Sequence, residues 1–527
     1  MVCLVTATEA TIKRSQSKKS RSGANLDYRS ILEKNGSAVD AAIATLFCEG
    51  IACAQCMGLG GGFLATVYDA SSQQVSVLNS RERAPAAATD TMFANASSTV
   101  GGLSVAIPGE LRGYGELHRK FGRLSWSEIV KPTADLCRRG HRVNSYMARA
   151  LKSYSSMIKA EPSMSELYVN PETNEVWNEG DMIKEPTLAN TLDIIAEEGP
   201  EAMHNGSLTS TLVADIKSFG GIITEEDMRN FEVEWQNPIE VPLIDDQTLY
   251  SSPLPGSGSI LAFILNMLHG WVGVGSDVPV GSNLYWHRIV ETFKYAYAKR
   301  TGLGDKHRTN LPYSMEELER NLSTPAWAKE FRDLVNDEHT NNDWKHYGAL
   351  FGGADDHGTA HVIVIAPDGS VVSATSTINY IWGAQRRSKS LGIMLNNEMD
   401  DFAISGHINV YGMPPSPANF IKPGLQPLSS MAPSLVLKKI KGEAPMPTLV
   451  LGAAGGTKIT TQVAMAVTKT LFEGKKLDDV ILLPRLHHQL LPMEVQIETD
   501  FNDVSLNFIF YIFFIKGTLV SQQNDDD

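Results

Sequence analysis

Thr359 stands where a polar segment meets an apolar one, a setting in which a side-chain hydroxyl could act as a nucleophile. The four residues before it read Asp-Asp-His-Gly, and those after it read Ala-His-Val-Ile-Val-Ile-Ala. Because Gly358 tolerates strained backbone geometry, the hydroxyl could attack the carbonyl carbon of Gly358 and form an ester that water then cleaves. Thr359 would become a new N-terminus. Its α-amine, with an unperturbed pKa near ~8, could accept the proton of its own hydroxyl.

A second threonine lies at the matching distance beyond a turn. Thr359 and Thr377 are each nine residues from Asp368, and Pro367-Asp-Gly-Ser370 separates two apolar runs. Asp-Gly between such runs predicts a β-hairpin, in which the two threonines face each other to within about one residue. Cross-strand Cβ atoms are ~5 Å apart, so one hydroxyl could hydrogen-bond to the other. An ordinary structural Thr–Thr pair gives the same pattern, so the spacing alone leaves both interpretations open.

The surrounding elements follow from periodicity and turn residues. Residues 108–235 are predicted to be mostly helical. The polar residues 303–356 are predicted to be an exposed segment with little strand character. Residues 1–25 are polar and basic, and are predicted to be disordered. Strands are predicted at 63–68, 74–79, 359–366, 371–378, 434–438 and 448–451, and helices at 39–54, 284–298 and 460–472.

Length, composition and charge limit the class of protein. The chain has 527 residues, of which 43% are hydrophobic and 20% charged, so a large core spread over more than one domain is expected. The formal net charge of −14 argues against a nucleic-acid partner, because phosphate contacts require a basic surface. No apolar run approaches the ~20 residues of a membrane-spanning helix, and we expect no signal peptide or membrane anchor.

No metal or cofactor is expected. The five cysteines all lie in the first 137 residues, and an odd, clustered set is not a disulfide framework. Cys53 and Cys56 have CxxC spacing without partners at zinc spacing, so core thiols or one local disulfide are expected. The glycines at 58–62 follow a helix and are not a dinucleotide fingerprint; close packing near the site is expected there. The run 455–458 lacks the Gly-Lys-Ser/Thr order of a phosphate loop.

Several longer motifs resemble those of γ-glutamyltranspeptidases, and the likeness runs from about residue 27 to about 493. The run around Thr359 resembles the family's processing site, and the other runs occur in the family's order. The motifs are Gly36-Ser-Ala-Val-Asp-Ala-Ala-Ile43, Gly58–Gly62, Asp356-His-Gly-Thr-Ala-His361, Ser373-Ala-Thr-Ser-Thr-Ile-Asn379, Asn396-Asn-Glu-Met-Asp-Asp-Phe402, Pro427-Leu-Ser-Ser-Met431 and Gly452-Ala-Ala-Gly-Gly-Thr457.

The resemblance implies a fold and a maturation step. The fold is an α+β, four-layer αββα sandwich of the N-terminal-nucleophile hydrolase type. Self-cleavage between Gly358 and Thr359 divides the chain into a large subunit, 26–358, and a small subunit, 359–527, which stay together. The tail, 494–527, departs from the family pattern, and the start of the chain shows neither the anchor nor the secretory signal that family members usually have.

The resemblance also assigns catalytic roles. Thr359 is both the processing residue and the nucleophile, and forms a γ-glutamyl ester. Thr377 hydrogen-bonds to the Thr359 hydroxyl. Gly455 and Gly456 match the oxyanion hole, where backbone N–H groups without side-chain obstruction approach developing negative charge. His357 and His361 flank the nucleophile and are expected to be structural or to assist processing.

A further set of residues matches the family's substrate site. Arg81 matches the arginine that holds the substrate α-carboxylate, as a planar guanidinium can, and Arg83 competes for that role. Ser429 and Ser430 match hydroxyls that assist with the same carboxylate. The acceptors for the substrate α-ammonium group match Asn379, Glu398 and Asp401.

The implied activity is hydrolysis or transfer of γ-glutamyl groups from glutathione or another γ-glutamyl donor to water, an amino acid or a dipeptide. A secreted or cell-surface location is the family expectation, and four N-x-S/T sequons occur, at Asn35, Asn95, Asn205 and Asn321. Two alternatives stay open. One is a related acylase that removes glutaryl-type groups, and the other is an unprocessed, inactive paralogue that acts as a binding protein.

Overall fold

Two five-stranded antiparallel sheets form the centre of the computed structural model. The structure describes residues 2–6, 28–273, 275–352, 358–406, 412–498, 501 and 518–522, with the backbone alone at 2–6, 28 and 518–522. The first sheet runs β11 (Ala360–Ile365), β12 (Val371–Thr377), β2 (Gly62–Asp69), β3 (Gln74–Ser80) and β8 (Glu234–Gln236). The second runs β1 (Val2–Thr6), β14 (Met446–Ala453), β13 (Ser434–Lys438), β10 (Gln247–Ser251) and β9 (Ile239–Pro242).

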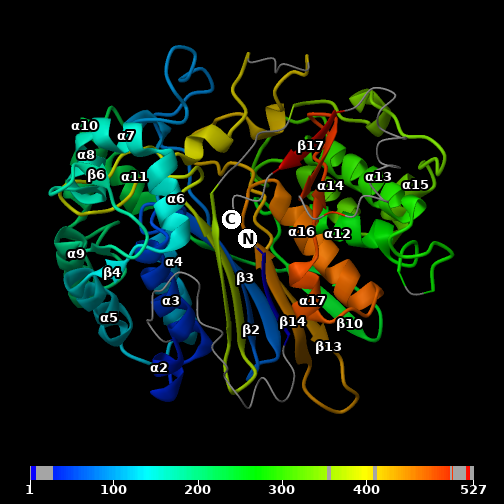
Figure 1. Cartoon of the computed structure of the whole chain (residues 1–527), viewed down its shortest axis with the longest axis horizontal. Helices are drawn as coiled ribbons and strands as arrows, with labels where there is room; N and C mark the ends of the chain where they lie inside the picture. The colour runs from blue at the N-terminus through cyan, green and yellow to red at the C-terminus, as the bar shows by residue number, and fades with distance from the viewer. Residues whose placement is uncertain are drawn as a thin grey trace.

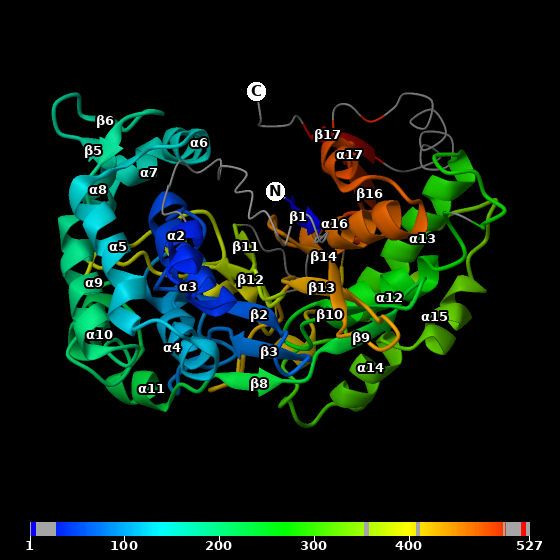
Figure 2. The ribbon, with the colours of Figure 1, turned by 90° about the horizontal axis from the view of Figure 1, so that it is seen from below.

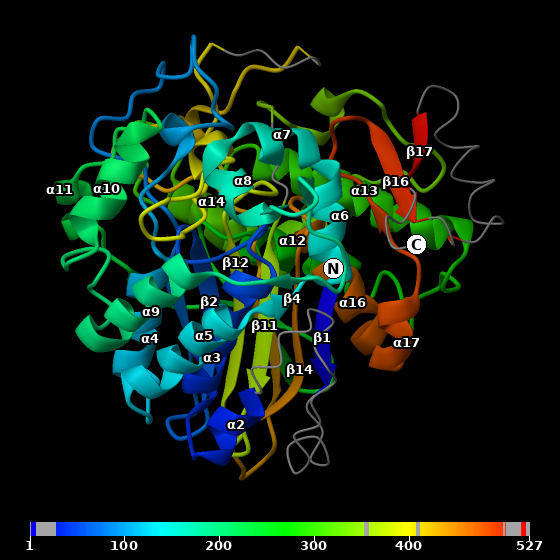
Figure 3. The same cartoon turned by 60° about the vertical axis from the view of Figure 1, so that its left-hand side comes forward.

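Apolar side chains from the two sheets pack against one another. Tyr68 and Val371 of the first sheet form one buried cluster with Leu435, Leu437 and Val450 of the second. Figures 1 and 3 show the two sheets side by side, and β11 and β12 lie against β14. The hairpin that carries the two threonines therefore has the second sheet on one of its faces.

Helices cover the outer face of each sheet, as the two ends of Figure 2 show. The larger apolar clusters join each group of helices to its own sheet. Over the first sheet lie α2 (Tyr28–Glu33), α3 (Ala38–Ala52), α4 (Glu110–Phe121), α5 (Trp126–Arg139), α9 (Pro186–Glu198) and α10 (Thr209–Ser218). Over the second lie α12 (Gly258–Leu268), α13 (Asn283–Arg300), α14 (Met315–Leu322), α15 (Pro325–Arg332) and α16 (Lys458–Val467).

Shorter elements complete the chain. The further helices are α6 (Ser145–Ser153), α7 (Ser155–Ala160), α8 (Pro162–Tyr168), α11 (Glu225–Asn230), α17 (Leu477–Leu482), η1 (Gly102–Ser104), η2 (Trp344–Tyr347), η3 (Glu398–Asp401), η4 (Pro417–Asn419) and the π-helix η5 (Thr468–Phe472). The further strands are β4 (His141–Arg142), β5 (Val169–Asn170), β6 (Glu175–Val176), β7 (Met182–Ile183), β15 (Leu486–His487), β16 (Glu494–Glu498) and β17 (Thr518–Gln522).

Helix α3 is buried on nearly all sides because its residues are small and apolar. It begins at a capping box, in which the Ser37 hydroxyl accepts from Asp40 N at 3.0 Å and the Asp40 carboxylate accepts from Ser37 N at 2.8 Å. The same carboxylate accepts from Arg123 N at 2.9 Å, which ties the loop before α5 to the start of α3. The far end of α3 leads into the glycine segment 58–62 and then β2.

The glycines of this segment lie against neighbouring backbone. A Cβ on Gly60 would lie 2.0 Å from the Met394 carbonyl oxygen, and a Cβ on Gly61 would lie 2.0 Å from that of Thr377. Real Cβ atoms do not approach so closely, so only glycine fits at both positions. The expectation of close packing near the site is confirmed.

Most elements predicted from the sequence are present. The hairpin is confirmed, with strands 360–365 and 371–377 on either side of the Asp-Gly turn. The helix predicted at 460–472 begins at Lys458 and changes to a π-helix over its last turn. The segment 303–356 has no strand among its described residues, in agreement with the little strand character expected, and it forms helices α14 and α15, which the sequence analysis did not predict.

Within the predicted disordered stretch 1–25, the structure describes Val2–Thr6 as strand β1, and the other residues lie outside the described ranges. Cys48, Cys53, Cys56 and Cys137 are free and buried, in agreement with core thiols. Within the described parts of the chain, no helix is both long enough and apolar enough to cross a membrane.

Candidate active site

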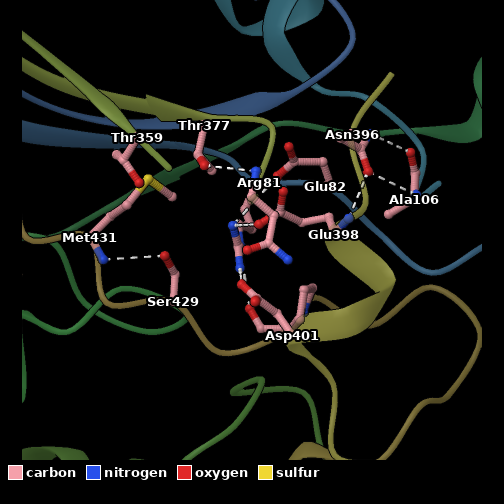
Figure 4. A network of polar contacts seen from close by, with 12 residues as sticks. Arg81, Glu82, Ala106, Thr359, Thr377, Asn396, Glu398, Asp401, Ser429 and Met431 are labelled. Atoms are coloured by element: carbon pink, nitrogen blue, oxygen red, sulfur yellow. Dashed lines mark hydrogen bonds and ion pairs between the residues drawn. The ribbon is translucent and has the colours of Figure 1, made fainter. Parts of the chain in front are cut away.

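Two hydroxyl groups converge on the carbonyl oxygen of Gly358. Thr359 Oγ1 donates to it at 2.6 Å, and Thr377 Oγ1 donates to it at 2.6 Å as well. The hairpin pairs Ala360 with Ser376, so its register continues to Thr359 opposite Thr377. Figure 4 shows the two threonines side by side. The sequence predicts a hydrogen bond from one hydroxyl to the other; in this uncleaved chain both instead bond to the carbonyl between them.

The backbone around Gly358 fixes this arrangement. Gly358 has φ of 110°, and a Cβ there would lie 2.6 Å from the Asn379 carbonyl oxygen and 3.0 Å from Ile381 N. Asn379 N donates to Thr377 Oγ1 at 2.8 Å. Because Thr377 accepts from Asn379 N, its own hydrogen is free to point at the Gly358 carbonyl. Thr359 and Thr377 are 8% and 3% exposed, so little water competes for these bonds.

Arg81 forms the centre of a buried ion cluster next to the threonines (Figure 4). Its guanidinium donates to Glu398 Oε1 through Nη1 and to Asp401 Oδ2 through Nη2, the latter at 2.5 Å. Burial alone lowers the pKa of Arg81, but the charges of Glu398 and Asp401 outweigh burial, so its pKa is raised. Glu398 and Asp401 are the first and last residues of the single turn η3, which places both carboxylates on one guanidinium.

Arg81 rather than Arg83 belongs to this cluster. Arg81 Nε and Nη2 also lie 3.4 Å from the carbonyl oxygens of Pro427 and Leu428. Arg83 Nη1 donates instead to the Gly424 carbonyl at 3.0 Å. Residues two apart point to the same side of a regular strand, so it is the different partners of Arg81 and Arg83 in the structure that separate the two arginines.

The two serines of the Pro427–Met431 run are buried but point to different partners. Ser429 Oγ accepts from Met431 N at 3.2 Å, and the Ser429 carbonyl accepts from Ser257 Oγ at 2.6 Å. Ser430 Oγ accepts from Arg300 Nη2 at 2.9 Å. Arg300 is 6% exposed and comes from the end of α13, so a second buried cation lies on this side of the site, which the sequence analysis did not identify.

Gly455 and Gly456 form the turn between β14 and α16. Their φ angles are 117° and 60°, and their carbonyl oxygens accept from Lys458 N at 3.3 Å and Ile459 N at 2.9 Å as the helix begins. A Cβ at Gly455 would meet nothing within 4 Å, so the space beside it is open. Successive N–H groups in such a turn can point at one anion.

His361 links this turn to the hairpin. Its Nδ1 lies 2.8 Å from Thr375 Oγ1, and a Cβ on Gly452 would lie 2.1 Å from the imidazole ring. Gly452 is near the end of β14, so the glycine turn emerges beside the start of β11. Desolvation lowers the pKa of His361 to about 3, so the ring is neutral at neutral pH. His357 lies outside the described residues.

Two buried carboxyl groups lie beneath the site, and the sequence analysis gave neither a role. Glu110 accepts from Ser376 Oγ at 2.8 Å and from the Tyr114 hydroxyl. Glu82 lies against Gly62, where a Cβ would be 2.7 Å from its Oε2. Desolvation raises the pKa of each group to about 8. In the sequence, the only sign that Glu82 belongs to the site was its position between Arg81 and Arg83.

Asn396 connects the ion cluster to the glycine segment. Its Nδ2 donates to the Gly60 carbonyl at 2.6 Å and to the Ala106 carbonyl at 2.9 Å. Its Oδ1 accepts from Ala106 N at 3.0 Å and from Glu398 N at 2.9 Å. All the hydrogen-bonding capacity of the amide is used, so Asn396 fixes the start of η3. Among the described residues, no group of His, Cys, Asp or Glu could hold a metal ion.

Known proteins resemble this chain over most of its length. Residues 28–509 match the family model described as gamma-glutamyltranspeptidase. Scoloptoxin SSD14 of Scolopendra dehaani is 41% identical over 90% of this chain and 81% of its own length. Glutathione hydrolase 2 of Arabidopsis thaliana is 36% identical, with 89% of this chain and 79% of its own length covered. Glutathione hydrolase 5 proenzyme of Mus musculus is 37% identical, with 87% and 79% covered.

Solved structures also resemble this chain. The cephalosporin acylase from Bacillus halodurans superposes with a TM-score of 0.77 at 20% identity, over 95% of this chain and 87% of its own, and shows the fold alone. The gamma-glutamyltranspeptidase from Pseudomonas nitroreducens complexed with L-DON superposes with a TM-score of 0.55 at 28% identity, over 63% of this chain and 96% of its own. From the family match, the identities and the shared fold, this chain belongs to the γ-glutamyltranspeptidase family and is an enzyme of that kind.

Proposed function

We propose that the chain cleaves itself between Gly358 and Thr359 and then hydrolyses or transfers γ-glutamyl groups through an ester on Thr359. The observation that carries the proposal is the convergence of the Thr359 and Thr377 hydroxyls, each at 2.6 Å, on the Gly358 carbonyl oxygen. A hydroxyl this close to the preceding carbonyl needs only a small rotation to bring its oxygen to the carbonyl carbon. The relatives that are named as proenzymes support a maturation step.

Self-cleavage follows from this geometry. Thr359 Oγ1 forms a bond to the Gly358 carbonyl carbon, the bond from that carbon to Thr359 N breaks, and the proton lost by Oγ1 ends on the nitrogen. The Thr377 hydroxyl donates to the oxygen on which negative charge develops. One such donor contributes about 3–4 kcal/mol. Water then hydrolyses the ester, leaving a carboxylate on Gly358 and restoring the Thr359 hydroxyl beside a free α-amine.

Turnover would repeat the attack on an external amide. The α-amine takes the proton of Thr359 Oγ1, which attacks the γ-carbonyl carbon, and the proton passes to the leaving amine. The N–H groups of Gly455 and Gly456 would stabilise the oxyanion. Water or an acceptor amine, such as an amino acid or dipeptide, then cleaves the γ-glutamyl ester.

The ion cluster suits the amino-acid end of such a substrate. Arg81 can bind an α-carboxylate, while Glu398 and Asp401 can bind an α-ammonium group. Arg81 together with Glu398 and Asp401 carries a net charge of about −1. The α-ammonium and α-carboxylate groups of a γ-glutamyl donor cancel, so this end of the donor adds no net charge to the cluster. A glutaryl group has no ammonium and would add a second negative charge beside Glu398 and Asp401. The charges therefore favour γ-glutamyl donors, with glutathione as the expected one, over the glutaryl substrates of a related acylase.

We also propose a sandwich fold that holds two subunits together after cleavage. The two sheets with helices outside them support the proposal of a four-layer αββα sandwich of the N-terminal-nucleophile hydrolase type, and cleavage would leave residues 26–358 and 359–527 as subunits joined by the shared core. We also propose a secreted or cell-surface location. The asparagines of three sequons, Asn35, Asn95 and Asn205, are exposed and could accept glycans.

The decisive experiment combines electrophoresis, mass spectrometry and a release assay. Purified protein should give two fragments, with a new N-terminus at Thr359, and should release the chromophore from a chromogenic γ-glutamyl amide but not from the matching glutaryl amide. An intact chain without activity would support the inactive paralogue instead. Release from the glutaryl amide alone would support the acylase.

A further inference from the structure

Arg300 is a buried cation that the chemistry proposed above does not use. Its Nη2 donates to Ser430 Oγ at 2.9 Å, and Ser430 is its one side-chain partner within the described part of the chain. Its Nε is buried without a hydrogen-bond partner among the same residues. Other buried arginines have carboxylate partners: Arg81 has two, and Arg288, earlier on α13, pairs with Asp337 at 2.7 Å.

The charge of Arg300 is only partly compensated where it lies. Burying an ionised group costs free energy unless the group is paired and hydrogen-bonded. Arg300 is the last residue of α13, where the carbonyl end of the helix carries part of a negative charge and offsets part of this cost. Because Ser430 contributes a neutral hydroxyl, the guanidinium keeps a positive potential that reaches whatever that hydroxyl binds. Such an arginine is suited to an anion that arrives with the substrate.

The backbone around Ser430 runs from the ion cluster to the helix that follows the glycine turn. The carbonyl oxygens of Pro427 and Leu428 lie 3.4 Å from Arg81 Nε and Nη2. The Ser430 carbonyl accepts from Thr460 Oγ1, on the first turn of α16, at 3.4 Å. Ser430 therefore belongs to the same short segment that contacts the guanidinium of Arg81.

The last turn of α13 also contacts the glycine turn. Tyr297 precedes Arg300 by three residues, so the two side chains are neighbours on the helix surface. The Tyr297 hydroxyl, which is also buried, donates to the carbonyl of Thr457, the residue after Gly456. One turn of one helix thus contacts both the Ser430 segment and the turn that would stabilise the oxyanion.

We infer that Arg300 is a positioning residue, which orients and polarises the Ser430 hydroxyl for the α-carboxylate of the donor. The inference rests on the proposed γ-glutamyl chemistry and deepens it. A serine hydroxyl has one hydrogen and two lone pairs. When one lone pair accepts from Arg300 Nη2, the hydroxyl can donate its hydrogen to a carboxylate oxygen. The positive charge behind the hydroxyl strengthens this bond, since hydrogen bonds with ionised partners are roughly twice as strong as neutral ones.

This role predicts an effect on KM rather than on kcat. The α-carboxylate does not react, so its contacts are equally strong in the bound substrate and in the transition state. Losing such a contact raises KM and leaves kcat nearly unchanged. The effect also requires the Ser430 hydroxyl and a substrate that carries the carboxylate.

The test uses three substitutions that separate charge from hydrogen bonding. Arg300→Lys keeps the charge, Arg300→Gln keeps a neutral donor, and Arg300→Met keeps neither. Arg332→Met is the matched control, because Arg332 is the last residue of α15, its Nη2 donates to the Asn266 carbonyl at 2.6 Å, and its Nε is also buried without a partner among the described residues.

Steady-state kinetics are measured on cleaved enzyme, with each substitution made in the native chain and in a Ser430→Ala background. The substrates are a chromogenic γ-glutamyl amide and the matching 4-aminobutanoyl amide, which keeps the amine but lacks the α-carboxylate.

We expect Arg300→Met to raise KM for the γ-glutamyl amide about tenfold, the effect of one hydrogen bond to a charged group, with little change in kcat. Arg300→Gln should give a smaller rise, and Arg300→Lys and Arg332→Met should stay close to the native chain. In the Ser430→Ala background, Arg300→Met should raise KM no further. The kcat/KM for the 4-aminobutanoyl amide should not change.

Three results would overturn the inference: a native KM in Arg300→Met, an equal rise in KM with and without the Ser430 hydroxyl, or an equal loss for both amides. If Arg300→Met does not mature, Arg300→Gln and Arg300→Lys decide, and equal KM values for these two would also overturn it. A native chain that stays intact or releases no γ-glutamyl group would instead refute the proposed function itself, so the two failures are distinguishable.

Discussion

At the scale of single residues, the carbonyl group of Gly358 is where the hairpin, the neighbouring loop and the glycine backbone meet. Thr377 accepts from Asn379 N at 2.8 Å and donates to the Gly358 oxygen at 2.6 Å. This order of donor and acceptor fixes the direction of the Thr377 hydrogen. A neutral hydroxyl in a buried place can therefore stabilise charge that develops only during the reaction.

Thr377→Ala removes this donor and leaves the nucleophile intact. We expect self-cleavage to slow about 100-fold or more, the usual effect of deleting one oxyanion donor, whereas Thr359→Ala should abolish cleavage. The measurement is a time course of fragment formation on denaturing gels. Thr66→Ala is the control, because Thr66 is equally buried on the adjacent strand and bonds only to the Pro433 carbonyl. A native rate for Thr377→Ala would show that the carbonyl is activated in another way.

Arg81→Lys keeps the positive charge but loses the planar fork that reaches Glu398 and Asp401 together. We expect KM for a γ-glutamyl amide to rise at least about tenfold with a smaller change in kcat, since the arginine would bind the part of the substrate that does not react. Steady-state kinetics on cleaved enzyme measure both values. Arg83→Lys is the matched control, because Arg83 bonds to the Gly424 carbonyl instead. Equal effects of the two substitutions would remove Arg81 from the substrate site.

At the scale of elements, the site depends on how closely the glycine segment approaches the end of β12. Gly61 lies against the carbonyl of Thr377, and Gly60 lies against that of Met394. The first contact sets the position of Thr377, and the second brings Asn396 and Glu398 towards Arg81. Backbone in direct contact with backbone leaves no side chain that could move aside to accommodate a change.

Gly61→Ala tests this dependence. Its Cβ would lie 2.0 Å from the Thr377 carbonyl oxygen, so we expect a loss of about 3 kcal/mol or more in the free energy of unfolding and slower self-cleavage. Gly424→Ala is the comparison, since nothing lies within 4 Å of its Cβ and only its φ of 75° opposes the change, at about 1 kcal/mol. Urea unfolding and fragment formation are the measurements. Two variants of equal stability would show that the close approach is not required.

At the scale of the whole molecule, buried titratable groups link stability to pH. The pKa of Glu110 is raised by desolvation from its ordinary 4.5 to about 8. The folded chain therefore binds more protons than the unfolded chain between these values, so the free energy of unfolding falls as pH rises through this range. Desolvation lowers the pKa of His361 and His204 to about 3, and for these groups stability falls as pH drops below about 6.5. Stability should be greatest in mildly acidic solution.

Glu110→Gln keeps an oxygen to accept from Ser376 and Tyr114 but cannot ionise. We expect the decline in the free energy of unfolding between pH 5 and 8 to shrink by roughly 2–4 kcal/mol, because one pKa unit corresponds to 1.36 kcal/mol. Urea unfolding at several pH values measures the slope. Glu128→Gln, at an exposed capping box on α5, should leave the slope nearly unchanged. A slope that is equally steep in Glu110→Gln would show that other groups set it.

The sequence by itself determined the hairpin, because an Asp-Gly turn between alternating runs fixes a register that needs no distant partner. The order of the family motifs in the sequence also identified Arg81, Glu398 and Asp401, which the structure brings together. Strands β8, β9 and β10 and helix α12 were not predicted. Short strands with mixed residues owe their form to the sheet they join rather than to local preference.

Only the tertiary structure decided which side chains meet. It placed Arg81 rather than Arg83 with the carboxylates, directed both threonine hydroxyls to one carbonyl, and raised the pKa of Glu82 and Glu110 by burial. The bond of Arg81 to Glu398 and the bond of Glu110 to Ser376 join residues 317 and 266 positions apart, and desolvation depends on everything packed around a group. Local sequence records neither, because both arise only when the two sheets and their helices close around the site.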